Sequence, residues 1–278
     1  RIRYAAHLAR DLDQPMTIVH CLETDLVDKL WSIVGRNRQT VRRDVRAKME
    51  TAYRQAVPTD ERPENVTFEI SEKDAVSGIL DLADTGEFSM VVMGATGRGA
   101  LENLTLGSTG DAVARSCGIP TLIVPAGSAP TEFEHVLAPV DDSRESSVSL
   151  EKAIKLAETW GAKLIIHHAF VLPAAGHLHP TDEAPPDGIE ELEESRWDSM
   201  ETFLEAFDFG DLETQTIFRL ENPYHSIVDA IEDYDIDLLV MGTRAERGVA
   251  RLIHGSNASK LLRKPPVPLM IVKQPPVE

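Results

Sequence analysis

A glycine- and hydroxyl-rich stretch follows one apolar run of this sequence and has the composition of an anion-binding site. The residues concerned are Met93, Gly94, Gly97, Gly107, Ser108 and Thr109, the last three directly before a helix-like segment. Glycine permits positive φ and close approach of a ligand, because it has no Cβ. A helix start offers unpaired N–H groups, and hydroxyls add further donors. The stretch therefore predicts a nest of backbone amides for a phosphate-like polyanion.

The spacing of this stretch differs from the common phosphate-binding motifs. It reads Gly, two residues, Gly, nine residues, Gly-Ser, which matches neither GxxxxGK[ST] nor GxGxxG. In the simpler interpretation the glycines serve ordinary turns, and Ser108 and its later counterpart Ser256 serve as helix N-caps. An N-cap serine can also contact phosphate, so the N-cap interpretation does not exclude phosphate binding.

The residue types that carry covalent or metal chemistry do not form a recognisable catalytic pattern. The sequence contains no GxSxG and no HExxH, and "DDSRESS" lacks the glycines of a phosphate loop. His20, His167 and His168 share no metal-ligand spacing with cysteines or carboxylates, so we expect them to pack or to hydrogen-bond. Cys21 and Cys117 form no CxxC pair, which indicates a reducing compartment without disulfides. These patterns favour a binding protein over an enzyme.

Composition and charge narrow the class of protein further. The chain has 278 residues, 42% hydrophobic and 27% charged, with a net charge of −18, which is typical of a globular, cytoplasmic protein. The basic residues at 38–48 are interleaved with polar ones and predict the solvent face of a helix, so no nucleic-acid partner is expected. No run has the length of a membrane span. The chain begins at Arg1 inside a helical pattern, and we expect it to be cut at its front.

The sequence repeats itself at a shift of 148 residues. Gly94 falls on Gly242 and His20 on His168 at this shift, as do the apolar runs before and after them. A single shift that holds from end to end indicates a duplication. The predicted organisation is a first domain at 1–126, a linker at 127–134 and a second domain at 135–278. The opening of the second copy has its counterpart before residue 1, so the first copy is expected to lack its first strand.

Within each copy, β-rich runs alternate with helical patterns. The strands predicted in copy two are 135–140, 163–169, 214–220, 237–242 and 268–273, the helices lie near 145–160, 190–208, 223–234 and 256–263, and copy one has strands at 16–21, 66–70, 89–94 and 120–125. This alternation predicts an α/β fold of two tandem, doubly wound, parallel five-stranded sheets of Rossmann-like type. Ligands of such sheets bind at the carboxyl ends of the strands.

The motif, the opening strand "VLAPVD", the histidine-containing second strands and the closing "PTLIVP" together resemble the universal stress protein (UspA-like) family. The resemblance covers nearly the whole chain as a tandem pair of domains. It implies a fold similar to the adenine nucleotide alpha hydrolases and binding of ATP, or of AMP or ADP, with or without Mg. It also implies a regulatory role in the stress response, and it leaves slow ATP hydrolysis open.

The resemblance assigns site residues copy by copy. The implied nucleotide-binding residues are Cys21, Met93, Gly94, Gly97, Gly107, Ser108 and Thr109 in copy one, and Pro139, Asp141, Ala169, Met241, Gly242, Gly255 and Ser256 in copy two. Asp141 would contact the adenine; in the less favoured alternative it only forms a turn with Asp142 and Ser143. Ala245 stands where copy two should have its second motif glycine, so we expect copy one to be the better phosphate cradle.

The resemblance also implies how the copies associate and leaves other functions open. The apolar edge strands at 121–125 and 269–273 are expected to meet antiparallel as an intramolecular pseudo-dimer, with a homodimer possible. In the alternative interpretation the chain is the cytoplasmic regulatory tail of a membrane transporter with one or both nucleotide sites degenerate. A membrane is expected as a partner only under this interpretation. A third interpretation is a structural interaction module without a ligand.

Overall fold

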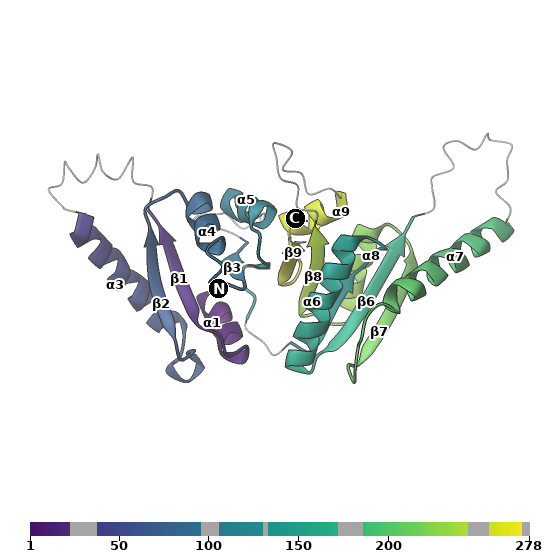
Figure 1. Cartoon of the computed structure of the whole chain (residues 1–278), viewed down its shortest axis with the longest axis horizontal. Helices are drawn as coiled ribbons and strands as arrows, with labels where there is room; N and C mark the ends of the chain where they lie inside the picture. Colours follow the sequence, from purple (N-terminus) through teal and green to yellow (C-terminus); the bar gives the residue numbers. More distant parts are fainter. Residues whose placement is uncertain (23–37, 96–105, 130–132, 172–185, 244–255, 274–278) are drawn as a thin grey trace. The chain divides into compact units, whose positions relative to one another are not determined.

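The chain folds into two compact units, Arg1–Pro130 and Thr131–Glu278 (Figure 1). The computed structural model describes residues 1–22, 38–95, 106–129, 133–171, 186–243 and 256–273. In each unit, helices cover the faces of parallel β-strands, as the alternating pattern predicts.

Unit 2 contains a five-stranded parallel sheet. Its strands are β5 (His135–Pro139), β6 (Lys163–Phe170), β7 (Thr214–Leu220), β8 (Leu238–Thr243) and β9 (Leu269–Lys273). They pair in the order β9-β8-β5-β6-β7. The chain moves outward from β5 first in one direction and then in the other, which confirms the doubly wound fold. All five strands lie within one or two residues of their predicted positions.

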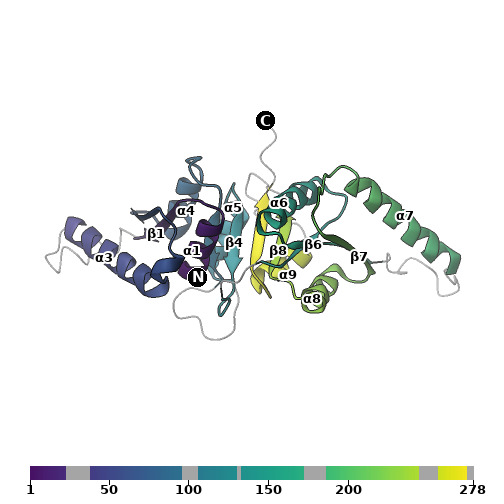
Figure 2. The same cartoon turned by 90° about the horizontal axis from the view of Figure 1, so that it is seen from below.

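The helices of unit 2 lie on both faces of this sheet. They are α6 (Arg144–Trp160), α7 (Pro186–Leu204), α8 (Pro223–Asp233) and α9 (Ser256–Arg263). Figure 2 shows α6 and α8 on opposite sides of the strands. The central strand β5 is therefore covered on both faces, and its residues Val136, Leu137 and Ala138 are fully buried. Burial on both faces explains why this strand is apolar throughout instead of alternating.

Local signals set the ends of these helices. Ser143 is the N-cap of α6 and accepts a hydrogen bond from the Ser146 N–H at 3.2 Å. The helix ends at Gly161, whose φ of 64° lies in the left-handed region that glycine adopts without strain. Asn222 caps α8 in the same way, with Pro223 as the first helical residue.

Unit 1 has the same element order, but its strands form two separate pairs. The strands are β1 (Met16–Cys21), β2 (Val66–Ser71), β3 (Val91–Gly94) and β4 (Thr121–Val124), and the helices are α1 (Ile2–Asp11), α3 (Arg38–Ala56), η1 (Thr59–Glu61), α4 (Ala75–Ala83) and α5 (Ser108–Ser116). β1 pairs with β2, and β3 pairs with β4, both parallel. No described strand of unit 1 is equivalent to β5, which agrees with the expected lack of a first strand.

Two apolar clusters hold the described part of unit 1 together. One gathers around Ala6, Tyr53 and Val57 and packs α1 and α3 onto β1 and β2. The other gathers around Val113 and Cys117 and packs α4 and α5 onto β3. Each strand pair thus has an apolar cluster of its own, although α4 also contacts β1.

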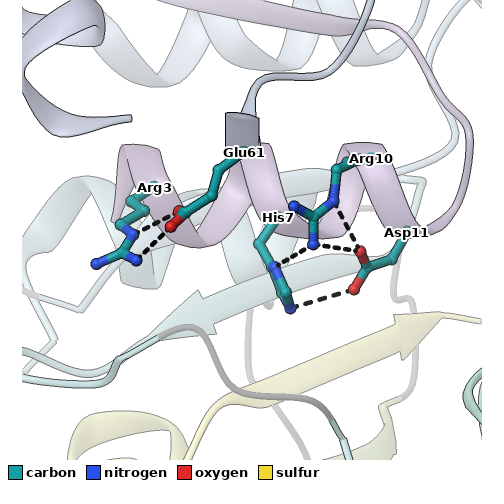
Figure 3. A network of polar contacts seen from close by, with 5 residues as sticks. All are labelled: Arg3, His7, Arg10, Asp11 and Glu61. Carbon is teal, nitrogen blue, oxygen red and sulfur yellow. Dashed lines mark hydrogen bonds and ion pairs between the residues drawn. The ribbon is translucent and has the colours of Figure 1, made fainter. Parts of the chain in front are cut away.

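Polar contacts fix the position and surface of α1 (Figure 3). Arg3 makes a two-pronged ion pair with Glu61 of η1, at 2.6 Å for Nε to Oε2. The Arg10 guanidinium lies 3.1 Å from His7 Nδ1. The other ring nitrogen, His7 Nε2, faces Asp11 Oδ2 at 3.2 Å. The contact with η1 joins two segments 58 residues apart and holds α1 over the strand pair β1–β2.

Candidate functional site

The start of helix α5 is bonded directly to the end of strand β3. The Gly107 N–H donates to the Ala95 carbonyl at 2.8 Å, and the Ala95 N–H donates to the Val124 carbonyl at 2.9 Å. Residue 107 thus lies beside the end of the strand that the chain left at residue 94. The first turn of α5 therefore lies at the carboxyl edge of β3 and β4, where sheets of this type bind ligands.

Among the described residues, no side chain caps the amides of this helix start. Gly107 occupies the N-cap position and makes no side-chain cap hydrogen bond. The side chain of Ser108 is exposed and that of Thr109 is half-buried. Asp111 is the acidic residue of the first turn, and its carboxylate accepts from Arg115 Nε at 2.8 Å, which offsets its charge. The first turn of α5 can therefore offer N–H donors and hydroxyls to an anion.

The expectation that motif glycines supply left-handed turns is wrong for Gly94 and Gly107. Gly107 has φ −64° and ψ 156°, which any residue adopts. Gly94 is not among the described glycines with positive φ, which are Gly86, Gly127, Gly161 and Gly210. Gly94 instead lies where the chain is crowded, because a Cβ there would collide with the Arg1 side chain. Gly97 and Gly255 lie outside the described residues.

Close approach is also the role of Gly242, the counterpart of Gly94 in unit 2. A Cβ at this position would collide with the carbonyl oxygen of Glu145 and lie 2.7 Å from its carbonyl carbon. Glu145 belongs to the first turn of α6, so the glycine lets that turn rest on the end of β8. Gly242 is thus required for packing at the edge where the nucleotide site was predicted.

Asp141 forms the turn between β5 and α6. Its Oδ1 accepts from the backbone N–H of Ser143 at 3.0 Å and from both the Ser143 and Ser146 hydroxyls, the latter at 2.6 Å. Partial desolvation would raise the pKa of Asp141, but these hydrogen bonds outweigh it and lower the pKa below its ordinary value. The Oδ1 atom is therefore engaged in the turn, as in the turn-forming alternative. A contact of this carboxylate with adenine stays a prediction, and it would use Oδ2.

The other predicted residues of unit 2 occupy the same edge of the sheet. Pro139 and Ala169 are half-buried at the ends of β5 and β6, and Met241 is buried near the end of β8. Ser256 is the first residue of α9. Because the strands are parallel, the ends of β5, β6 and β8 meet, together with Asp141, at one edge.

In unit 1 two predicted residues face the interior. Met93 packs against the apolar cluster under α4 and α5. The Cys21 Sγ lies 3.9 Å from the Ala75 carbonyl, and burial raises the pKa of its thiol. It faces α4 because Gly78 of that helix leaves room for it: a Cβ at Gly78 would lie 2.9 Å from the sulfur.

His168 and His167 are buried hydrogen-bonding residues, as the sequence predicts. His168 Nδ1 donates to the Val140 carbonyl at 2.8 Å, and its ring lies 5.3 Å from that of Phe218. This bond holds the backbone directly before Asp141. His167 Nε2 lies 2.8 Å from the Ser226 hydroxyl in α8. Burial lowers the pKa of His167 to about 4, and the nearby positive charge of Arg219 contributes to the shift.

Acid should weaken unit 2 through His167. Its pKa is about 4 in the folded chain against an ordinary 6.5, so the unfolded state binds more protons between these values. Stability is then complete above pH 6.5 and is lost as the pH falls toward 4. We expect the free energy of unfolding to drop by about 2 kcal/mol between pH 7 and pH 5. Urea denaturation of the chain at both pH values measures this drop.

The variant His167→Gln separates this residue from other titrating groups. The glutamine amide can still hydrogen-bond Ser226, but it takes up no proton. Its free energy of unfolding should therefore change little between pH 7 and pH 5. If the variant loses as much stability on acidification as the parent chain, His167 is not the source of the pH dependence.

The sequence did not single out two residues at this edge. The first is Ser146, whose hydroxyl donates a hydrogen bond to Asp141. The sequence signal for it was the Ser143-x-x-Ser146 spacing of a helix cap. We considered "DDSRESS" only as a phosphate loop without glycines, and this spacing was overlooked. Thr243 follows Gly242 and is buried, and its hydroxyl has no hydrogen-bond partner among the described residues. Its counterpart in copy one, Ala95, is apolar, so comparison of the two copies did not point to Thr243.

Within the described ranges, no group of three or more histidines, cysteines and carboxylates is placed to hold a metal ion. No helix in that part of the chain combines the length and apolar composition of a membrane span.

The fold and this edge define the class of protein: a tandem pair of doubly wound α/β units, with a helix start at the strand ends. A model of the universal stress protein family matches residues 2–125 and again 132–273, so the chain belongs to that family as a two-domain member. A universal stress protein of Mycobacterium tuberculosis (strain ATCC 25618 / H37Rv) is 24% identical over 272 residues, which cover 94% of this chain and 88% of that protein.

Solved structures agree with the fold. The crystal structure of a universal stress protein from Archaeoglobus fulgidus DSM 4304 superposes with a TM-score of 0.64 and covers 98% of this chain and 92% of its own, at 19% identity. A functionally unknown protein of Pseudomonas aeruginosa PAO1 gives 0.63, with coverage of 97% and 85%, at 16% identity. At these identities the likeness establishes the architecture of the two units and nothing finer.

Proposed function

We propose that this chain is a regulatory protein that binds an adenine nucleotide, with ATP held most tightly, at the α5 edge of unit 1. One observation carries the proposal: the bond from Gly107 to Ala95 holds the start of α5, which no described side chain caps, against the end of β3. A helix start in this position concentrates N–H donors and a positive dipole end, which together suit a phosphate group.

The exposure of each group at the start of α5 indicates which part of the nucleotide it would contact. The N–H groups of the first turn of α5 would hold the phosphate tail, and the exposed Ser108 and half-buried Thr109 would add hydroxyl donors. The pairing of Asp111 with Arg115 reduces the repulsion that a free carboxylate would exert there. Mg²⁺, if it takes part, would be bound mainly by the nucleotide's own phosphates.

Unit 2 is proposed as the weaker site. Asp141 can present only one oxygen to a base, because the other accepts three hydrogen bonds. Ala245, which stands at the position of a motif glycine, lies outside the described residues. The proposed stoichiometry at moderate ligand concentration is therefore one nucleotide per chain.

A phosphate series tests the site. Isothermal titration of the chain with adenosine, AMP, ADP and ATP, with and without Mg²⁺, should give affinities that rise with the number of phosphates. Each phosphate that gains charge-assisted hydrogen bonds from the helix start should tighten binding by roughly tenfold or more. If adenosine binds as tightly as ATP, the helix start does not hold the phosphates. If ATP fails to bind at low millimolar concentration, the chain is not a nucleotide-binding protein.

A further inference from the structure

We propose that unit 2 contains a binding site for a short aliphatic diamine, in a hollow between helix α7 and strand β7. The hollow has a volume of about 330 Å³, which is the size of a small-molecule site. It belongs to a different unit from the proposed nucleotide site at α5, so neither proposal depends on the other. Its lining residues are Trp197, Met200, Glu201, Leu204, Glu205 and Thr216.

The floor of the hollow is apolar. Met200 is buried and Leu204 is half-buried. Trp197 is 37% exposed although its side chain is large and apolar, and its ring meets that of Phe218 in β7 at 77°, with centroids 5.3 Å apart. This contact holds the indole between α7 and β7. Its open part offers an apolar surface and a π-electron face to a ligand.

Two carboxylates stand at the rim of the hollow. Glu201 and Glu205 are both exposed, and no described lysine or arginine forms an ion pair with either of them. The Trp197 Nε1–H donates to Glu201 Oε1 at 2.8 Å, which fixes this carboxylate beside the indole. The two glutamates are one helical turn apart, a rise of about 6 Å along the axis. The rim therefore repels anions and attracts a cationic ligand.

The equivalent place in unit 1 is filled by apolar side chains. At the shift of 148 residues α3 coincides with α7, and β2 falls on β7. Tyr53 and Val57 are buried core residues there, and the ring of Tyr53 lies 5.9 Å from that of Phe68. Their counterparts in unit 2 are Glu201, Glu205 and Thr216. The hollow is thus set by the polar side chains of unit 2 and not by the fold that the two units share.

Charge and spacing together define the ligand. An ammonium group can pair with each of Glu201 and Glu205, and an aliphatic chain between the two groups would cover the apolar floor. 1,4-Diaminobutane carries its ammonium groups about 6 Å apart, which matches one turn of α7. An ammonium beside the Trp197 ring would also gain a cation–π contact. Because both carboxylates are exposed, we expect a dissociation constant on the order of 1 mM.

The indole N–H signal of Trp197 in an NMR titration of the full chain tests the site. Added 1,4-diaminobutane should shift this signal, because the N–H is bonded to Glu201. The Trp160 indole is the internal control: it is buried and stacks on Phe133, so its signal should not move. 1-Aminobutane should bind roughly fivefold more weakly or worse, because it can pair with only one carboxylate. The variant Trp197→Phe identifies the signal by removing it.

Glu205→Gln and Glu151→Gln form a matched pair of variants. Each removes one negative charge from an exposed position, but only Glu205 lines the hollow. Glu205→Gln should weaken the binding of 1,4-diaminobutane by roughly fivefold. Glu151→Gln should bind it as the parent chain does. An unchanged Trp160 signal in both variants shows that their fold is intact.

Three results would overturn the proposal. The first is a Trp197 signal that does not respond to 1,4-diaminobutane well above millimolar concentration. The second is binding of 1-aminobutane as tight as that of the diamine, which would mean that the two carboxylates do not act together. The third is an equal shift with Mg²⁺, or an equal loss of affinity in both variants. Either form of the third result would indicate general attraction of cations to a chain of charge −18.

Discussion

Replacing Gly242 by alanine should lower the free energy of unfolding of unit 2 by about 3 kcal/mol, at the upper end of the usual range for overpacking. The added methyl group would collide with the carbonyl of Glu145, which is backbone at the start of α6. No rotation of a side chain can relieve this contact. The first turn of α6 must move away from β8, and the turn of Asp141 directly before it would be disturbed as well.

Thermal unfolding followed by circular dichroism measures the effect, and a fall of roughly 10 °C in the midpoint is expected for a unit of this size. Gly118→Ala is the matched control, because the nearest atom to its new Cβ is Asp84 Oδ1 at 3.9 Å. Gly94→Ala should lie between the two, since only the flexible Arg1 side chain must yield. A Gly242→Ala chain as stable as the Gly118→Ala chain would show that α6 does not need this close approach.

The variant Ser108→Asp should weaken ATP binding by about 100-fold or more while leaving the fold intact. A carboxylate at the first position of α5 would occupy the N–H donors of the helix start and repel the phosphates. The same charge interacts favourably with the helix dipole, so stability should stay equal or rise by about 0.3–1 kcal/mol. A variant that folds well but does not bind separates the ligand site from the structural role of the helix cap.

Ser116→Asp provides the matched control at the other end of the same helix. Ser116 is the exposed last residue of α5, so the change in net charge is identical. ATP titrations of both variants, with thermal midpoints recorded alongside, make the comparison. If both variants lose affinity equally, the overall charge of −18 governs binding and the helix start has no special role.

Much of the fold could be predicted because its signals are local. The apolar run at 163–169 became strand β6 at nearly that position, since a strand buried on both faces needs consecutive apolar residues. The helix predicted near 190–208 runs from 186 to 204 instead. Its bounds were harder to predict because its sequence carries little periodic apolar pattern. The antiparallel meeting of the edge strands at 121–125 and 269–273 stays a prediction.

The sequence by itself determined the duplication, the family and the succession of strands and helices along the chain, because the shift of 148 residues and the apolar runs can be read from consecutive residues. Only the tertiary structure decided what the site residues do. It gave Gly242 a packing role, engaged Oδ1 of Asp141 with Ser143 and Ser146, and joined His167 to Ser226 across 59 residues. Such contacts depend on how distant elements pack against each other, and residue types and spacing along one chain do not specify those distances.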